Sequence, residues 1–242
     1  MTAWIALGRD SDEVEAHAMQ GAQHLRAARG TDEAAALAHL DFEADRVVHI
    51  GDGPPDTLPA PVLPKGGRGL SALIQDTPPD VIGARVRLWI GGFLSRQPNW
   101  DGVICALDGG ISHWIHISAN EAVSAQGFLT PRLIGALGGT APPDTDALAD
   151  SLSRPERLAG HLRAAEVGGD SAAITGHLLG AELAAARPYW LGQQVVLIAA
   201  EDMAATYAPA LEAQHVPAER HAPSALLPAG LSALAGALGL AA

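Results

Sequence analysis

The sequence predicts an α/β fold. Short apolar runs typical of strands alternate along the chain with alanine-rich segments that favour helices. The 242 residues, of which 48% are hydrophobic, are enough for one large α/β domain or two small ones. The polar connection "SRQPNWDG" separates apolar segments on either side. We therefore place a boundary near Ser95, with an N-terminal lobe at residues 1–95 and a C-terminal lobe at residues 96–242.

The first two apolar segments predict a β-hairpin. "WIAL" is a short strand, and "EVEAHAM" alternates polar and apolar residues, which places its small apolar residues on one face. The turn between these segments is acidic. A helix over residues 11–29 is the alternative, because alanine is the strongest helix former.

The rest of the chain continues the alternation. "TDEAAALAHL" opens with a capping residue and an acidic first turn, which predicts a helix, and "RVVHI" predicts a buried strand. Residues 51–79 are dense in proline and glycine and predict a loop with at most one short helix. The pair Gly91-Gly92 predicts an interruption in the helix that follows this loop. Later strands are expected at 103–107, 113–117 and 193–199, and later helices at about 129–137, 154–165, 170–187, 202–214 and 223–239.

The charge of the chain argues against nucleic acid and anionic membrane surfaces as partners. The formal net charge is −12 and Lys65 is the only lysine, so the positive surface that phosphate backbones require is missing. No apolar run reaches the ~18 residues of a membrane span, and no signal-peptide pattern is present, so we expect a cytoplasmic protein. Cys105, the single cysteine, lies in the apolar run "VICAL" and is expected to be buried and unreactive. No pattern indicates the oligomeric state.

Three stretches resemble a known family. They are the opening "WIALGRDSDEVEAHAMQG", the turn "LDGGISHW" and the segment Gly176 to Tyr189, "GHLLGAELAAARPY". Together they resemble 2-dehydro-3-deoxygalactonokinases, which are sugar-acid kinases of the actin-like ATPase superfamily. The resemblance implies a two-lobed ribonuclease H-like sugar-kinase fold with a shortened N-terminal lobe and a nucleotide in the cleft between the lobes. It also implies ATP-dependent phosphorylation of a 2-keto-3-deoxy sugar acid, with magnesium and ATP as cofactors.

The first phosphate motif of this family is altered here. The family has Asp-Trp-Gly followed by two hydroxyl residues, and this sequence has "GRDSD" from Gly8 to Asp12. Gly8 replaces the metal-binding aspartate, Asp10 replaces the glycine, and Ser11 keeps a hydroxyl for phosphate. Two carboxylates ~4 Å from a phosphate would repel it by about 1 kcal/mol each in water. The turn is therefore expected to repel nucleotide phosphate unless a cation intervenes, with Asp10 as the replacement ligand.

The second phosphate motif is better preserved. The family has G-T-H-C/S-K-W, and here the sequence reads "GGISHW" from Gly109 to Trp114. The backbone N–H groups of Gly109 and Gly110, together with Ser112, are the candidates for binding an anion. His113 stands at the lysine position, so a positive partner is expected to be missing.

The remaining family motifs have lost their carboxylates or their glycine. Phe128 stands where the family's T-G-E has its glutamate, and Arg85 and Val86 stand where R-G-E-E has two. General-base catalysis on a sugar hydroxyl requires such a group within hydrogen-bond reach. The adenosine-side motif A-G-T-S-L reads "AAEDM" at residues 199–203, where two acids replace neutral residues.

Two charged residues are candidates for binding the sugar acid. Arg163 has a guanidinium that can hold a carboxylate in bidentate fashion, and Glu182 stands where the family retains an acid. Each has a structural alternative. Arg163 can pair with a nearby surface glutamate, and Glu182 can pair with Arg187 or lie in solvent.

Two functional hypotheses therefore stand side by side. In the first, the protein is a 2-dehydro-3-deoxygalactonokinase with unusual site residues that uses magnesium and ATP. In the second, it is a pseudokinase, a non-catalytic homologue that needs no cofactor and binds a sugar acid or a partner protein. The altered motifs favour loss of the ordinary kinase reaction.

Overall fold

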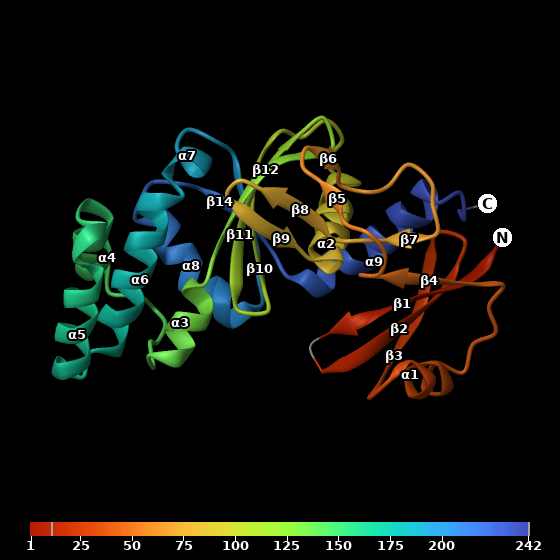
Figure 1. Cartoon of the computed structure of the whole chain (residues 1–242), viewed down its shortest axis with the longest axis horizontal. Helices are drawn as coiled ribbons and strands as arrows, with labels where there is room; N and C mark the ends of the chain where they lie inside the picture. Colours follow the sequence, from red (N-terminus) through yellow and green to blue (C-terminus); the bar gives the residue numbers. More distant parts are fainter. Residues whose placement is uncertain (11, 242) are drawn as a thin grey trace. The chain divides into compact units, whose positions relative to one another are not determined.

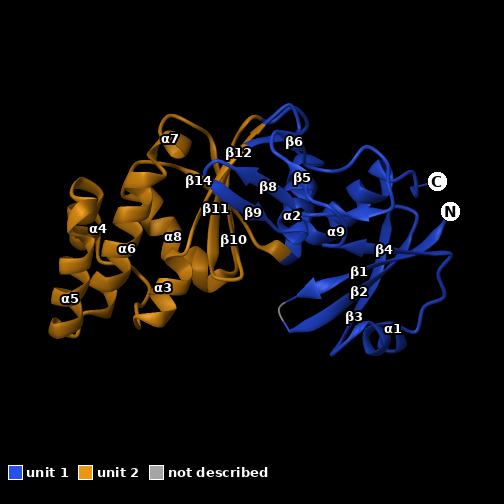
Figure 2. Ribbon diagram, in the orientation of Figure 1, with its two compact units in different colours: residues 1–100, 118–123, 224–242 blue, residues 101–117, 124–223 orange. Residues whose placement is uncertain are grey.

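The computed structural model describes residues 1–10 and 12–241 and divides into two compact units (Figure 2). Unit 1 comprises Met1–Trp100, Ser118–Val123 and Ser224–Ala242, and unit 2 comprises Asp101–Ile117 and Ser124–Pro223. The first segment of unit 1 ends close to the predicted boundary near Ser95. Two later segments also join unit 1, which the prediction had not included.

Unit 1 contains a five-stranded sheet of order β3-β2-β1-β4-β7 (Figure 1). β1 pairs with β2 and β2 with β3 in antiparallel fashion, whereas β4 lies parallel to β1 and β7 parallel to β4. The predicted hairpin is confirmed, and the alternative helix over residues 11–29 is wrong. Burial of apolar side chains on both faces of the sheet outweighs the helix propensity of alanine. The strands are β1 (Ala3–Asp10), β2 (Glu13–Gln20), β3 (Gln23–Gly30), β4 (Arg46–Ile50) and β7 (Gly69–Leu70).

Alternate residues of β1 contribute to two different hydrophobic cores. Ile5 and Leu7 pack in the cluster that includes Leu40 of α1 (Glu33–Leu40). Trp4 and Ala6 belong to the cluster formed with α2 (Ala84–Leu94) and α9 (Pro223–Ala237). The N-terminus of α1 is capped as predicted, because the Asp32 side chain accepts a hydrogen bond from the Ala35 N–H.

The proline- and glycine-rich segment is more ordered than predicted. Three short strands lie in it in addition to β7, and a fourth begins at its last residue. The buried guanidinium of Arg87 holds several points of this segment together. Arg87 donates to the carbonyls of Pro61, Val62 and Ser71 at 3.0, 2.8 and 2.8 Å, and it pairs with Asp56 at 2.9 Å. Sequence periodicity does not show that the carbonyl groups of a segment accept hydrogen bonds from one side chain distant in the sequence. The prediction of a loop failed here for that reason. These strands are β5 (Asp56–Thr57), β6 (Ala60–Pro61), β8 (Leu73–Asp76) and β9 (Pro79–Ile82).

α2 continues through Gly91-Gly92, so the predicted interruption is wrong. A Cβ atom on Gly92 would lie 2.2 Å from the carbonyl oxygen of Leu226 in α9. The glycine therefore permits close packing between two helices rather than ending one of them.

Unit 2 is built on strands of the order β14-β13-β10-β11-β12 (Figure 1). The second predicted hairpin, β10–β11, is confirmed, and β13 runs parallel to β10. β12 begins in unit 1, where Glu121 pairs with Pro61 of β6. The strands are β10 (Gly102–Asp108), β11 (Ile111–Ser118), β12 (Glu121–Phe128), β13 (Val195–Ile198) and β14 (Ala218–His221).

The helices of unit 2 surround a core that includes Trp114, Cys105 and Leu179. The helix predicted at 154–165 is displaced. α4 ends before Pro155, where the proline ring and its missing N–H favour a new helical start. None of the helices described is long and apolar enough to cross a bilayer. The helices are α3 (Thr130–Ala136), α4 (Thr145–Ser153), α5 (Leu158–Gly168), α6 (Ser171–Ala185), α7 (Arg187–Trp190) and α8 (Glu201–Glu212), with a 3₁₀ turn at Pro155–Arg157.

Candidate functional site

Two arginines pair with carboxylates of the acidic β1–β2 turn. The Asp10 carboxylate pairs with the guanidinium of Arg85 from α2, and its second oxygen lies 3.2 Å from Arg29 Nη2. Arg29 also contacts Glu15 at 3.2 Å and Glu13 at 3.7 Å. The expected repulsion of phosphate therefore needs correction for Asp10, whose carboxylate has two arginine partners, and stays a prediction for Asp12. Ser11, the predicted hydroxyl donor, lies outside the described residues.

Gly8, at the metal-ligand position implied by the resemblance, packs directly against the neighbouring strand β4. A Cβ atom on Gly8 would lie 2.8 Å from the carbonyl oxygen of Ile50 and 2.9 Å from its Cβ. Contacts this short require the backbone to move. The position therefore lacks a metal-binding side chain, and it also lacks the space for one.

The hollow beside Gly8 and Arg85 is small. It has a volume of about 20 Å³ and is also lined by Arg9, Glu15 and His17. That is room for about one water molecule, whereas small-molecule sites commonly occupy about 300 Å³ or more. This hollow is therefore too small for a sugar.

A histidine pair lies next to this hollow. His17 Nε2 is 3.3 Å from a Glu15 oxygen, and His17 Nδ1 is 3.2 Å from His24 Nε2. The hydrogen bond from His17, together with the charges of His17 and Arg29, lowers the pKa of Glu15 to about 2 despite its burial. Burial, followed by the charge of His17, lowers the pKa of His24. Glu15 is therefore ionised and engaged at neutral pH.

These residues do not fit a magnesium–nucleotide complex. Magnesium in phosphotransferases is held by one or two carboxylates together with water and phosphate oxygens. Asp10 is occupied by Arg85 and Arg29, and Gly8 offers no oxygen from a side chain. No group of three or more His, Cys, Asp or Glu residues within 1–10 and 12–241 is arranged to hold a metal ion.

The β10–β11 turn differs from the acidic turn in its backbone and its charge. Gly109 and Gly110 have φ angles of 57° and 82°, a left-handed conformation that glycine adopts without strain. The Arg132 N–H donates to the Gly110 carbonyl at 3.1 Å, and Arg132 Nη2 lies 3.5 Å from the Gly109 carbonyl oxygen. The expectation that this turn lacks a positive partner is wrong. Arg132 comes from α3, and no local sequence pattern connects it to the turn.

Ser112, the third predicted member of this anion site, is committed to a buried network around Glu182. Ser112 Oγ donates to Glu182 Oε1 at 2.8 Å, and Trp114 Nε1 donates to the same oxygen at 2.9 Å. The Tyr207 hydroxyl donates to Oε2 at 2.9 Å. Glu182 is only 3% exposed, and burial raises the pKa of its carboxyl while the hydrogen bonds act in the opposite direction.

Glu182 thus joins β11, α6 and α8 rather than facing solvent. The suggested pairing with Arg187 is wrong, because the carboxylate oxygens turn instead to Ser112, Trp114 and Tyr207. The pKa of the nearby Cys105 thiol is raised by the thiol's own burial and, to a smaller extent, by the negative charge of Glu182. Cys105 is fully buried, as predicted.

Arg163 lies apart from this network. It projects from α5 with a side chain that is 71% exposed, and it pairs with Glu166 one turn further along the helix. The alternative interpretation, a surface ion pair, is confirmed. Arg163 and Glu182 are not brought together into one carboxylate-binding site.

Two further motif positions have structural roles. Phe128, at a lost carboxylate position, packs against the core of unit 2. Glu201 and Asp202 form the first turn of α8, where Asp202 Oδ1 accepts a hydrogen bond from the Met203 N–H at 2.8 Å. Acidic residues at a helix N-terminus stabilise the helix dipole, and they oppose the binding of a phosphate there.

Comparison with known proteins supports the resemblance. Residues 146–234 match the family model of 2-keto-3-deoxy-galactonokinase. The search among curated proteins gave no sequence match. A solved structure from Sinorhizobium meliloti, provisionally assigned as a 2-dehydro-3-deoxygalactonokinase, superposes with a TM-score of 0.82 at 18% identity and covers 98% of this chain and 99% of that one.

Two more distant structures share the fold. Component A of the (R)-2-hydroxyglutaryl-CoA dehydratase from Acidaminococcus fermentans has a TM-score of 0.53 at 12% identity and covers 100% of this chain and 99% of that one. The activator of the 2-hydroxyisocaproyl-CoA dehydratase from Clostridium difficile, solved with bound ADPNP, has a TM-score of 0.51 at 9% identity, with 99% and 95% covered. The predicted α/β fold of the actin-like ATPase and sugar-kinase type is confirmed, and residues 146–234 carry the match to the 2-keto-3-deoxy-galactonokinase family.

Proposed function

We propose that this protein is a sugar-acid kinase homologue of the 2-keto-3-deoxygalactonokinase type that does not carry out phosphoryl transfer and retains the fold to bind a sugar acid or a partner protein. The ion pair between Arg85 and Asp10 carries the proposal. Arg85 stands at a position where the family resemblance implies a carboxylate, and its guanidinium pairs with Asp10, the acidic residue of the same turn that could replace the missing metal ligand.

The packing around Gly8 supports the same proposal. Phosphoryl transfer depends on a metal ion and on donors that stabilise charge on the transferred group. Removing a single electrostatic stabiliser from an active site commonly lowers the rate by a factor of about 10² to 10³. Here the metal-ligand position implied by the resemblance is Gly8, which packs against Ile50 and has no space for a carboxylate side chain.

The second candidate is the family reaction itself, the ATP-dependent phosphorylation of a 2-keto-3-deoxy sugar acid with magnesium. Two observations favour it. Asp10 lies two residues from Gly8 and carries a carboxylate that a magnesium ion could attract away from Arg85. Arg132 supplies the positive charge at the glycine turn that the sequence did not reveal.

A coupled assay of ADP release, with 2-keto-3-deoxygalactonate and ATP in the presence and absence of magnesium, distinguishes the two candidates. It is run on the full chain and on Asp10→Ala, with Asp12→Ala as the matched control. Asp12 has the same charge and lies in the same turn, but it has no ion pair with Arg85 or Arg29. Calorimetric titration with magnesium-ATP and with the sugar acid measures binding in parallel.

The proposal expects no magnesium-dependent turnover from any of the three proteins and no magnesium-ATP binding. Binding of the sugar acid without turnover would support the ligand-binding form of the proposal. Magnesium-dependent turnover that is lost in Asp10→Ala and kept in Asp12→Ala would overturn it, because it would identify the turn as a rebuilt metal site.

A further inference from the structure

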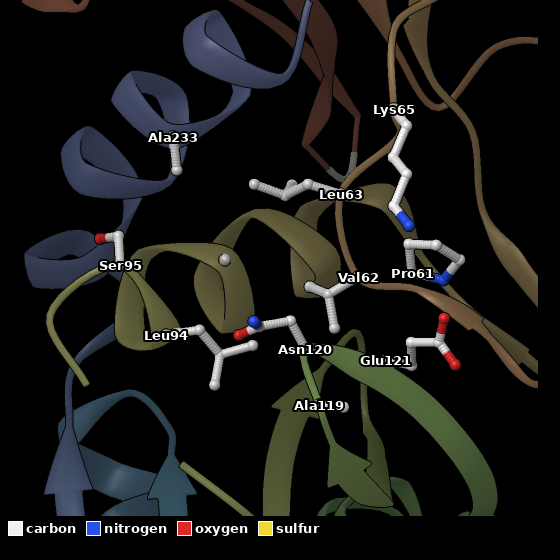
Figure 3. Close-up of a pocket in the computed structure, with 11 residues that line it drawn as sticks. Pro61, Val62, Leu63, Lys65, Leu94, Ser95, Ala119, Asn120, Glu121 and Ala233 are labelled. Atoms are coloured by element: carbon white, nitrogen blue, oxygen red, sulfur yellow. The ribbon is translucent and has the colours of Figure 1, made fainter. Parts of the chain in front are cut away.

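A larger pocket lies elsewhere in unit 1. Its volume is about 400 Å³, within the usual range of small-molecule sites of about 300–1,000 Å³. Four elements of unit 1 form it: the chain between β6 and β7, the C-terminal end of α2, the β11–β12 turn and α9 (Figure 3). None of the altered kinase motifs contributes to its lining, so this pocket is independent of the proposed function.

The polypeptide around the pocket is fixed by buried interactions. The guanidinium of Arg87 donates to the carbonyls of Pro61 and Val62. The Val62 N–H donates in turn to the Asn120 carbonyl at 3.0 Å, and Glu121 pairs with Pro61 across two strands. The main chain that carries the lining side chains is therefore held in place before any ligand arrives, which lowers the entropic cost of binding.

Two opposite charges line one side of the pocket without neutralising each other. Lys65, the only lysine of the chain, and Glu121 lie on the same side, above and below Pro61 in Figure 3. Across residues 1–10 and 12–241, neither of these two side chains has an ion-pair or hydrogen-bond partner. By contrast, Arg85 and Arg87 are both paired with aspartates.

The rest of the lining is mainly apolar. Leu63, Leu94 and Ala233 surround the space away from the two charges, and Figure 3 shows the Leu63 side chain directed across the pocket. The Asn120 side chain adds an amide. The Ser95 hydroxyl already donates to the Gly92 carbonyl at 2.8 Å, which leaves its oxygen as an acceptor.

We propose that this pocket binds a free α-amino acid with a large apolar side chain. The Lys65 ammonium receives the α-carboxylate, and the Glu121 carboxylate receives the α-ammonium. The apolar side chain lies against Leu63, Leu94 and Ala233. A zwitterion pairs with both Lys65 and Glu121 at once. A simple anion would pair with Lys65 and be repelled by Glu121, and a simple cation would pair with Glu121 and be repelled by Lys65.

The test is calorimetric or NMR titration of the full chain with L-leucine, L-methionine and L-phenylalanine, and with three analogues matched to leucine. 4-Methylpentanoate lacks the ammonium, 3-methylbutylamine lacks the carboxylate, and glycine lacks the apolar side chain. The variants are Lys65→Met and Glu121→Gln. Arg163→Met and Glu166→Gln make the corresponding charge changes on an exposed pair in unit 2 and serve as controls.

We expect L-leucine to bind and each analogue to bind at least about tenfold more weakly, which corresponds to about 1.4 kcal/mol. The same loss is expected in Lys65→Met and Glu121→Gln, with unchanged affinity in the two controls. The proposal is overturned if leucine, methionine and phenylalanine all fail to bind, if an analogue lacking one charge binds as well as leucine, or if Lys65→Met and Glu121→Gln leave the affinity unchanged. Circular dichroism of the variants excludes unfolding as the cause of a loss, since Lys65 is exposed and Glu121 lies at the start of a strand.

Discussion

The two hairpin turns of this chain have opposite character, although each joins two neighbouring antiparallel strands of a sheet. At β1–β2, three carboxylates are held by Arg29 and Arg85, and Gly8 packs against the next strand with no space for a side chain. At β10–β11, a Cβ atom on Gly109 would meet nothing within 4 Å. Arginines from β3 and α2 pair with Asp10 at the first turn, whereas the second turn keeps open space and a nearby arginine. Retaining a hairpin therefore does not retain the chemistry of its turn.

The largest effect is expected where the second hairpin is anchored. Glu182→Ala removes the acceptor of Ser112, Trp114 and Tyr207, and each buried donor left unsatisfied costs about 1–3 kcal/mol. We expect the free energy of unfolding of unit 2 to fall by about 3 kcal/mol or more, measured by urea denaturation and by hydrogen exchange of unit 2 peptides. Glu166→Ala, at an exposed ion pair, should cost less than about 1 kcal/mol. Equal effects of the two substitutions would show that the buried network is not stabilising.

The second prediction compares the glycines of the two turns. Gly8→Asp restores the family residue, but its Cβ would press on Ile50, so we expect a loss of about 2 kcal/mol from overpacking and no gain of magnesium-ATP binding. Gly109→Asn should cost less than about 1 kcal/mol, because asparagine tolerates a φ of 57° and the space is open. Urea midpoints and calorimetry measure both changes. A stable Gly8→Asp variant that binds magnesium-ATP would contradict the argument from packing.

Acidification provides a graded comparison of the two units. The pKa values of His24 in unit 1 and His177 in unit 2 are lower in the folded protein than the ordinary histidine value of 6.5. As the pH drops, these histidines therefore take up protons in the unfolded chain before they do so in the folded protein. The free energy of unfolding consequently falls as the pH drops below 6.5. Burial, followed by the charge of His161, lowers the pKa of His177. The stability supplied by Glu15 is complete above pH 4.5 and is lost as the pH falls towards its folded pKa of about 2.

Unit 1 should therefore lose additional stability below pH 4.5, and Glu15→Gln should remove that additional loss. Hydrogen exchange of peptides from each unit at pH 7.5, 5.5 and 4 follows the two units separately. His177→Asn should flatten the pH dependence of unit 2 between pH 7.5 and 5.5. An identical pH dependence of Glu15→Gln and the unsubstituted protein would refute the assignment of Glu15.

A small effect on stability, about 1 kcal/mol, is expected from Asp10→Ala, because its arginine partners are partly exposed. The substitution should nevertheless change the preference for anions. In the unsubstituted protein, NMR shifts on adding phosphate should concentrate at Gly109, Gly110 and Arg132. In Asp10→Ala they should extend to Arg29 and Arg85, whose charges are then less compensated. Phosphate shifts centred on the β1–β2 turn of the unsubstituted protein would contradict this expectation.

Local sequence patterns predicted most of the helices and strands. They predicted few of the side-chain contacts that shape the candidate functional site. Alternation in "EVEAHAM" and the glycines of "LDGGISHW" indicated both hairpins, and the spacing of "TDEAAALAHL" indicated α1. Arg87, Arg85 and Arg132 were not identified as organising residues, since each acts on segments distant in the sequence. Gly92 was misinterpreted for the same reason: its partner is the Leu226 carbonyl in α9.

The sequence by itself determined the α/β class, the family resemblance carried by three separate stretches, and the absence of the family's carboxylates at Gly8, Phe128 and Val86. These follow from residue identity and local periodicity, which are written in the chain. Only the tertiary structure decided that Asp10 is neutralised by arginines, that Gly8 has no space for a side chain, and that Lys65 and Glu121 line one pocket. Charge compensation and packing depend on distances between groups far apart in sequence, and those distances exist only once the chain has folded.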